Sequence, residues 1–128
     1  MERLLWVCLA GAMGTGARYL VAVWAGSRFG TVFPYGTLIV NVAGCFLIGL
    51  LMQLALNLPG FPVNLRFALT TGFLGGLTTY SSFAYETTKL AEDGAHGTAA
   101  LNLAVTTVGG LGAVVLGLAL ARWLTRAA

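Results

Sequence analysis

Residues 70–83 read TTGFLGGLTTYSSF, and they lie within a run that is otherwise apolar enough to cross a membrane. The stretch holds three glycines, four threonines and two serines. Each glycine inside a helix costs about 1 kcal/mol relative to alanine, and threonine hydroxyls compete for backbone hydrogen bonds. A non-helical turn at membrane depth is tolerated only where protein or a cavity satisfies the freed backbone groups. The stretch therefore predicts a helix that is broken in the middle of the membrane.

The rest of the chain has the composition of an integral membrane protein. Of its 128 residues, 58% are hydrophobic and 9% are charged, whereas a soluble domain carries about 25% charged residues. The apolar residues form four runs, each near the ~20 residues that cross a bilayer; these are residues 4–25, 36–57, 66–90 and 98–121. Short loops between the runs favour antiparallel neighbours. We therefore expect one all-α domain, residues 1–128, with four transmembrane helices and the third helix broken.

The charged residues indicate a weak orientation preference. Arginines dominate the side that would hold the N-terminus, the second loop and the C-terminus, against two basic residues on the other side; the two sets are Arg3, Arg66, Arg122 and Arg126, and Arg28 and Lys89. This positive-inside bias places both termini in the cytoplasm, and it is weak enough to allow insertion in both orientations.

The first run resembles a signal peptide at its start, but its apolar character continues past Arg18, so we expect it to be retained.

Several functional classes find no support in the sequence. The net charge is +3 and the basic residues are scattered, which does not indicate nucleic-acid binding. Cys8 and Cys45 are expected to be small buried hydrophobic residues, and the single histidine, His96, lies in a polar loop. The segment GTGARY (14–19) lacks the preceding strand and third glycine of a phosphate loop. With no Ser/His/Asp grouping available, the chain is not expected to be an enzyme.

The polar residues inside the spans are the informative ones, because a charge at the bilayer centre costs about 2.5–3.5 kcal/mol on insertion scales. Arg18 lies in the first span and Glu86 in the third, where the two could form a structural ion pair or serve a pathway. Asn41 lies in the second span, where it could hydrogen-bond a neighbouring helix or donate to an ion.

The residues after the predicted break suit a small anion. Tyr80 and Phe83 are three residues apart and so share a helix face, with Ser81 and Ser82 beside them. The edges of aromatic rings carry partial positive charge. Together with the amide of Asn41, they would form a series of weak donors without a full positive charge to trap the ion. A glycine-rich packing interface would explain the glycines, but not the hydroxyls and aromatic rings together.

Three segments resemble the small bacterial fluoride channels of the CrcB/Fluc family: GFLGGLTTYSSF (72–83), Asn41 in TLIVN, and GTGARY (14–19). The resemblance covers all four spans. It implies a fluoride-selective channel of the bacterial inner membrane, formed by an antiparallel dual-topology homodimer with two pores and a structural sodium ion at the interface. By motif position, the sodium ligands fall on the backbone carbonyls of Gly75 and Thr78. The fluoride pathway falls on Asn41, Tyr80, Ser81, Phe83, Glu86 and Arg18.

Two positions depart from the family pattern. The first aromatic residue is usually phenylalanine, and Tyr80 adds a hydroxyl that needs a partner. The fourth span often carries a serine where this chain has Gly110, so Thr106 or Thr107 is expected to supply a hydroxyl instead.

Two other functions are compatible with a small four-span protein. A proton-coupled multidrug antiporter would need a glutamate embedded in the first span, but the acid there is Glu2, at the edge of the span. A non-conducting partner subunit would explain the packing glycines but would leave the broken span without a purpose.

Overall fold

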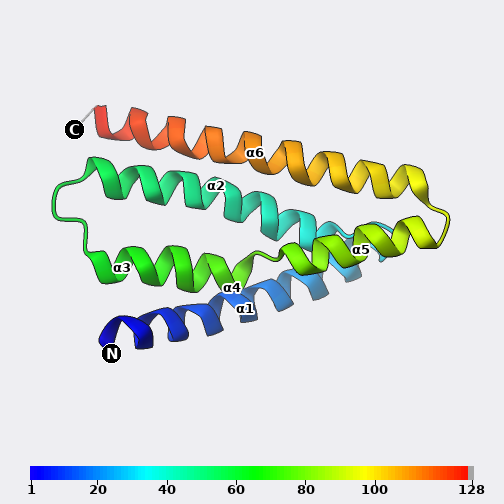
Figure 1. Cartoon of the computed structure of the whole chain (residues 1–128), viewed down its shortest axis with the longest axis horizontal. Helices are drawn as coiled ribbons and strands as arrows, with labels where there is room; N and C mark the ends of the chain where they lie inside the picture. Colours follow the sequence, from blue (N-terminus) through cyan, green and yellow to red (C-terminus); the bar gives the residue numbers. More distant parts are fainter. Residues whose placement is uncertain (127–128) are drawn as a thin grey trace.

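A computed structural model describes residues 1–126 of the chain, and every element within them is helical. In chain order the elements are α1 (Glu2–Phe29), α2 (Tyr35–Asn57), α3 (Val63–Phe67), the π-helix η1 (Ala68–Leu74), α4 (Gly75–Leu77), α5 (Tyr80–Glu92) and α6 (His96–Arg126) (Figure 1). Three of them, α1, α2 and α6, are long and apolar enough to cross a membrane. The elements from α3 to α5 run end to end as one interrupted rod, called here the broken helix (residues 63–92).

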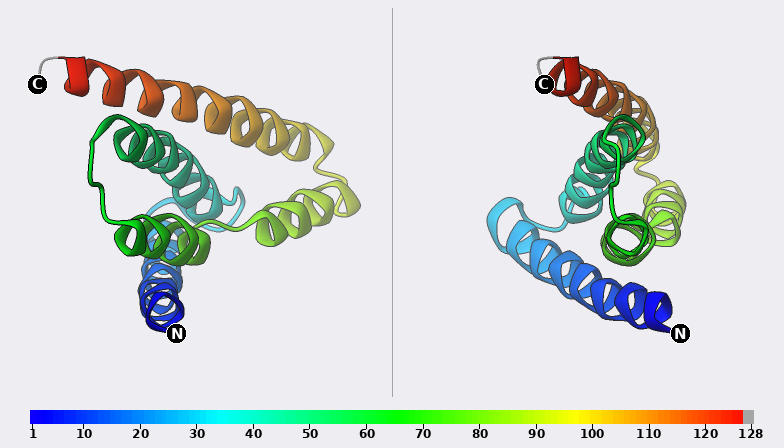
Figure 2. Two further views of the ribbon diagram at one scale, coloured as in Figure 1. Left: turned by 60° about the vertical axis from the view of Figure 1, so that its left-hand side comes forward. Right: turned by 90° about the vertical axis from the view of Figure 1, so that its left-hand side faces the viewer.

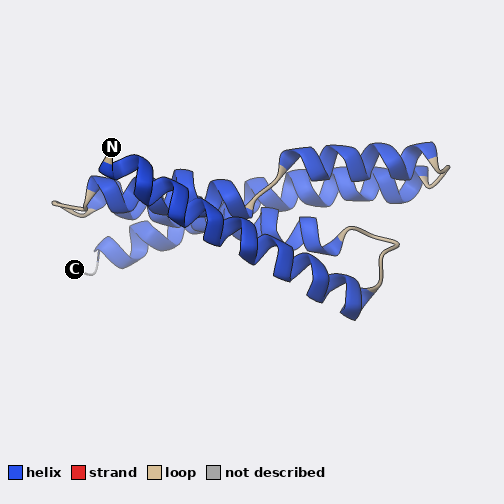
Figure 3. Ribbon diagram, turned by 90° about the horizontal axis from the view of Figure 1, so that it is seen from below, coloured by secondary structure: helices blue, strands red, loops and turns tan. Residues whose placement is uncertain are grey.

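The interruption of the broken helix confirms the central prediction, and it falls within the predicted stretch, directly before Tyr80. Figure 3 shows the break as a short loop between two helical rods. It falls on Thr78 (φ −83°, ψ 156°) and Thr79 (φ −152°, ψ 114°), both in extended conformation. Gly72 and Gly75 are helical. The break is therefore made by the two β-branched threonines, and the glycines before it have another use.

That use is close packing against α1. A Cβ atom added at Gly76 would collide with the backbone carbonyl of Gly11, and one added at Gly72 would lie 2.7 Å from the carbonyl oxygen of Val7. From the other side, a Cβ atom at Gly14 would collide with the carbonyl of Phe73. Small residues let membrane helices approach in this way, so glycines fix α1 against the first half of the broken helix.

The remaining helices pack around this pair. α2 and α6 lie side by side along their lengths, and α5 leans on α6 (Figures 1 and 2). Within residues 1–126, α1 and α6 do not touch; they lie on opposite sides of the broken helix and α2. A small buried cluster of Val40, Leu74 and Leu77 joins α2 to the first half of the broken helix. The arrangement leaves a groove beside the break, with walls formed by α2, α6 and the broken helix.

Two glycines on α1 give a matched test of the close packing. Gly14→Ala is expected to lower the stability of the solubilised protein by about 1–3 kcal/mol, because the new methyl group overlaps backbone that cannot move freely. Gly16→Ala should not destabilise, since nothing lies within 4 Å of its Cβ position. Thermal unfolding followed by circular dichroism measures both. Equal losses in the two variants would contradict the account of the α1 contact.

Candidate functional site

The backbone hydrogen-bonding groups of Thr79, at the break, are paired with one side chain of the neighbouring helix α2. The Thr79 N–H donates to Asn41 Oδ1 at 2.8 Å, and Asn41 Nδ2 donates to the Thr79 carbonyl oxygen at 3.0 Å. Asn41 thus pairs with an extended residue as a neighbouring strand would. The helix–helix hydrogen bond considered for Asn41 is present. Its amide nitrogen carries two hydrogens, and one of them remains for a second partner.

The second half of the broken helix begins with a side-chain cap. The Oγ1 atom of Thr79, the N-cap residue of α5, accepts from the Ser82 N–H at 3.2 Å. The same oxygen lies 3.2 Å from Ser81 Oγ and donates to Ser82 Oγ at 3.1 Å. Hydroxyl groups therefore cluster at the start of α5, where the helix dipole places partial positive charge.

The first half of the broken helix ends with free carbonyl groups. Both the N–H and the Oγ1 of Thr78 donate to the Leu74 carbonyl oxygen, at 3.0 and 2.9 Å. Among the described residues, no hydrogen bond ends on the carbonyl oxygens of Gly75 or Thr78. The last carbonyls of a helix carry partial negative charge and need partners. This end of the break can therefore accept a cation or donors from outside the chain.

An open cavity of about 500 Å³, called here the break groove, lies beside the break. It brings together most of the predicted site residues: Asn41, Gly75, Thr78, Tyr80 and Phe83. Thr106, Thr107 and Gly110 of α6 also line it. None of its lining residues carries a charge. Ser81 stands outside this lining set, although its hydroxyl reaches Thr79 within it.

The two aromatic side chains at the groove differ in their setting. The ring centroids of Tyr80 and Phe83 are 5.8 Å apart and their planes are inclined by 58°. Phe83 is 7% exposed and held by its neighbours, whereas Tyr80 is 80% exposed. One ring is therefore fixed in the wall of the groove, and the other projects away from the subunit.

Glu86 and Arg18 are not brought together. Glu86 Oε1 accepts from Thr37 Oγ1 at 2.8 Å, and Oε2 is buried with no hydrogen-bond partner in the described part of the chain. Glu86 lines a second cavity of about 360 Å³, near the loop after α1. The ion pair considered for Arg18 and Glu86 does not form; between residues 1 and 126, Lys89 makes the ion pairs, with Glu92 and Asp93. Thr37, which holds the carboxyl group, was not predicted because it lies 49 residues away.

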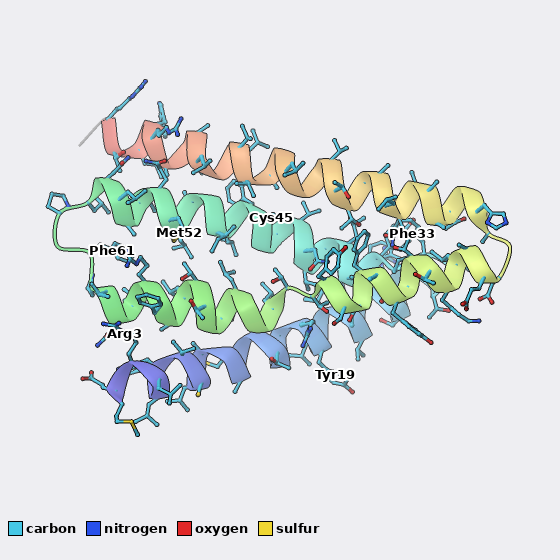
Figure 4. The ribbon with its side chains drawn as sticks, viewed as in Figure 1. Arg3, Tyr19, Phe33, Cys45, Met52 and Phe61 are labelled. Atoms are coloured by element: carbon cyan, nitrogen blue, oxygen red, sulfur yellow. The ribbon has the colours of Figure 1, made fainter. Side chains whose placement is uncertain are left out.

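The space beside Gly110 is limited by the thiol of Cys45. A Cβ atom at Gly110 would lie 3.3 Å from Cys45 Sγ, and both residues line the break groove. Figure 4 labels Cys45 on the middle of α2. Cys45 is half-buried, and Cys8 is exposed in the subunit, so the prediction that both cysteines are buried is wrong for Cys8. A larger residue at position 110 would have to displace the thiol.

Asn102 is a polar residue that the sequence analysis missed. Its side chain is 1% exposed, and its Nδ2 donates to Thr87 Oγ1 at 2.8 Å. Thr87 Oγ1 donates in turn to the Phe83 carbonyl at 2.7 Å. This chain of hydrogen bonds ties α6 to α5 directly behind Phe83. A sequence signal existed, since asparagine is costly in an apolar span without a partner.

Asn102→Leu is expected to loosen α5 while retaining the fold. The change removes an interhelical hydrogen bond worth about 0.6–2 kcal/mol from a helix that touches α2 only slightly. Amide hydrogen exchange should rise in α5 and stay unchanged in α2. Unaltered exchange in α5 would show that Asn102 does not hold it.

Helices of membrane-spanning length surround a discontinuous helix, and a groove at the break exposes hydroxyl groups and an amide among apolar side chains. These features define a multi-pass membrane protein with a helix broken in the way that membrane proteins use to bind ions or solutes. The chain belongs to the CrcB family: the family model described as "CrcB-like protein, Camphor Resistance (CrcB)" matches residues 5–118. The resemblance predicted from the motifs is confirmed.

The curated relatives of the chain match over nearly its whole length. A protein of Anaeromyxobacter sp. (strain K) is 51% identical over 124 residues, covering 97% of this chain and 98% of the relative. One from Geobacter metallireducens is 49% identical, covering 97% and 100%, and one from Citrifermentans bemidjiense is 48% identical, covering 95% and 98%. Each of the three is named "Fluoride-specific ion channel FluC".

Proposed function

We propose that the protein is a fluoride-selective channel of the bacterial inner membrane that allows cytoplasmic fluoride to leave passively. The observation that carries the proposal is the uncharged break groove, with its ring edges, hydroxyl groups and amide, in a chain about half identical to relatives named as fluoride channels. Hydrogen fluoride is a weak acid that enters cells and ionises at neutral pH. A leak for the trapped anion lowers internal fluoride without an energy source, so no enzymatic chemistry is required.

The donors around the groove suit a compact anion. Phe83 lines the groove and would offer its ring edge to the ion, Asn41 retains one amide hydrogen, and α5 begins at the break with its positive dipole end. Weak donors in series allow an ion to enter and also to leave, which conduction requires. In this proposal, Tyr80 and Ser81 continue the pathway beyond Phe83, and Glu86 and Arg18 act at its outer parts.

The proposed assembly is an antiparallel, dual-topology homodimer of four-span subunits. The broken helix serves as the remaining span, with residues 63–77 and 80–92 crossing the bilayer together. Support for a partner comes from the open side of the groove. Tyr80 is 80% exposed there, and Gly75 is exposed with nothing within 4 Å of its Cβ position. A second subunit would cover these residues and enclose two pores.

A structural sodium ion at the centre of this dimer is part of the proposal. The carbonyl oxygens of Gly75 and Thr78 accept no hydrogen bond from the described part of the chain. Two such subunits would offer four carbonyl oxygens, which are hard ligands suited to an alkali cation. The ion would hold the subunits together and stay in place while fluoride moves.

Gly75→Leu tests the assembly without disturbing the subunit. Because nothing inside the chain meets the new side chain, the change should leave helix content unchanged and reduce the dimer fraction and the bound sodium. Gly112→Leu is the matched control, since Gly112 is also exposed and helical with open space around it. Size-exclusion chromatography with light scattering, and elemental analysis after exchange of sodium for a large organic cation, give the readouts. A dimeric, sodium-free Gly75→Leu protein with full fluoride flux would contradict the proposed sodium site.

The channel and the multidrug antiporter are distinguished by the gradient that drives transport. A channel should release fluoride from liposomes down its gradient with no proton gradient present. A multidrug antiporter should instead take up a cationic dye only when a proton gradient is imposed. Dye uptake without fluoride release would overturn the proposed function.

A further inference from the structure

The positive charge of the chain gathers at one end of the molecule. The start of α1, the start of α3 and the end of α6 lie together there (Figure 1). Four arginines against one glutamate belong to this end, so it carries the whole formal net charge of +3; the arginines are Arg3, Arg66, Arg122 and Arg126. At the opposite end, Lys89 is paired with Glu92 and Asp93.

Two of these arginines flank one aromatic ring. The guanidinium carbons of Arg3 and Arg66 lie 5.0 and 5.3 Å from the centroid of the Phe67 ring, so they are at most 10.3 Å apart. Arg3 Nε donates to Asn64 Oδ1 at 3.2 Å, which fixes the direction of that side chain. Figure 4 shows Arg3 at the end where α1 and α3 begin.

Neither arginine has a carboxylate partner among residues 1–126. Glu2, the acid at this end, accepts from Trp6 Nε1 at 3.3 Å. Holding two guanidinium groups beside one ring brings like charges together, which an anion would relieve. Guanidinium groups bind phosphate through several parallel hydrogen bonds, and the terminal nitrogens of both arginines are free of hydrogen bonds within the described chain.

Apolar side chains surround Arg3 and Arg66, and they favour a phospholipid over free phosphate as the ligand. Leu4 and Leu5 of α1 are 58% and 64% exposed, and Val63 and Leu65 of α3 are each 46% exposed. Because these residues begin two helices, we expect them to lie where a bilayer passes from headgroups to acyl chains. A phospholipid would place its phosphate on the arginines and its chains on the leucines and valine, whereas free phosphate would use only the arginines.

We propose that Arg3, Arg66 and Phe67 form a binding site for the phosphate headgroup of an anionic phospholipid. The proposal depends on the membrane-spanning fold and not on fluoride conduction. In an antiparallel dimer, one such site would face each leaflet.

Native mass spectrometry of the purified protein in neutral detergent tests the site, with phosphatidylglycerol and phosphatidylcholine of matched acyl chains as probes. The wild-type protein should retain phosphatidylglycerol in preference to phosphatidylcholine. The double variant Arg3→Gln/Arg66→Gln should bind phosphatidylglycerol roughly tenfold less, since each basic residue near an anionic lipid contributes a several-fold factor. Phe67→Leu, which keeps both charges but removes the ring that both guanidinium groups approach, should give a smaller loss.

The matched control is Arg122→Gln/Arg126→Gln, which removes the same charge from the same end but outside the cluster. It should retain wild-type binding within about twofold. Equal losses in the two double variants would show that only net charge matters and would overturn the site. Equal retention of both lipids by the wild-type protein would overturn it as well. Displacement of phosphatidylglycerol by an equal concentration of inorganic phosphate would show a soluble-phosphate site and contradict the lipid assignment.

Discussion

Replacing Phe83 by isoleucine is expected to lower fluoride efflux by about two- to tenfold while the protein stays folded and dimeric. Phe83 is 7% exposed and lines the break groove, so isoleucine can occupy most of its space. What the variant lacks is the electropositive ring edge. Aromatic edge interactions contribute about 0.5–1.5 kcal/mol, and 1.36 kcal/mol corresponds to a tenfold change in rate.

Tyr80→Phe is the companion variant for this measurement. It keeps a ring at the exposed neighbouring position and removes only the hydroxyl group, so efflux should remain close to that of the wild-type protein. Fluoride-electrode recordings from liposomes with equal amounts of protein compare all three. Wild-type efflux from a folded Phe83→Ile protein would mean that Phe83 only packs the groove wall. An inactive Tyr80→Phe protein would instead assign an essential role to the Tyr80 hydroxyl.

Asn41→Leu is expected to have the largest effect on stability. The side chain accepts from the Thr79 N–H and donates to the Thr79 carbonyl, at 2.8 and 3.0 Å. Leucine leaves both backbone groups unpaired beside the apolar helices, at a cost of about 1–3 kcal/mol for each group. The free energy of unfolding should therefore fall by about 2–6 kcal/mol, and fluoride efflux should fall with it.

The same substitution at the end of the same helix provides the control. Asn57 donates to Thr125 Oγ1 at 2.7 Å but is exposed to solvent, so Asn57→Leu should cost no more than about 1 kcal/mol. Thermal unfolding in detergent compares the two variants. Similar losses would mean that the break does not depend on Asn41.

The broken helix shows how far the sequence could predict this fold. The run of glycines and threonines predicted an interruption, and one is present within that run, at Thr78 and Thr79. The pattern did not show which residues of the run would leave the helix. Glycine can loosen a helix or allow a neighbour to approach closely, and the two uses look the same along one chain. Only the position of α1, which runs against Gly72 and Gly76, separates them.

The candidate site also combines features that the sequence could predict with features that it could not. Tyr80 and Phe83 could be placed on one face because their spacing is local, and the structure places both at the break groove. Hydrogen bonds between spans depend on how far each helix is shifted along its neighbour, which no local pattern contains. For this reason, the contacts Thr37–Glu86 and Asn102–Thr87 were missed. The sequence could not decide whether Arg18 and Glu86 form an ion pair, and among residues 1–126 they do not.

The most direct test of the proposed function is the release of fluoride and of chloride from separate sets of liposomes that contain the purified protein. Each set is loaded with one anion, and potassium with an ionophore balances the charge. The groove offers only weak, closely set donors and no charged side chain, so fluoride should leave rapidly and chloride should stay at the level of protein-free liposomes. Equal release of the two anions, or no release of fluoride, would contradict the assignment of a fluoride-selective channel.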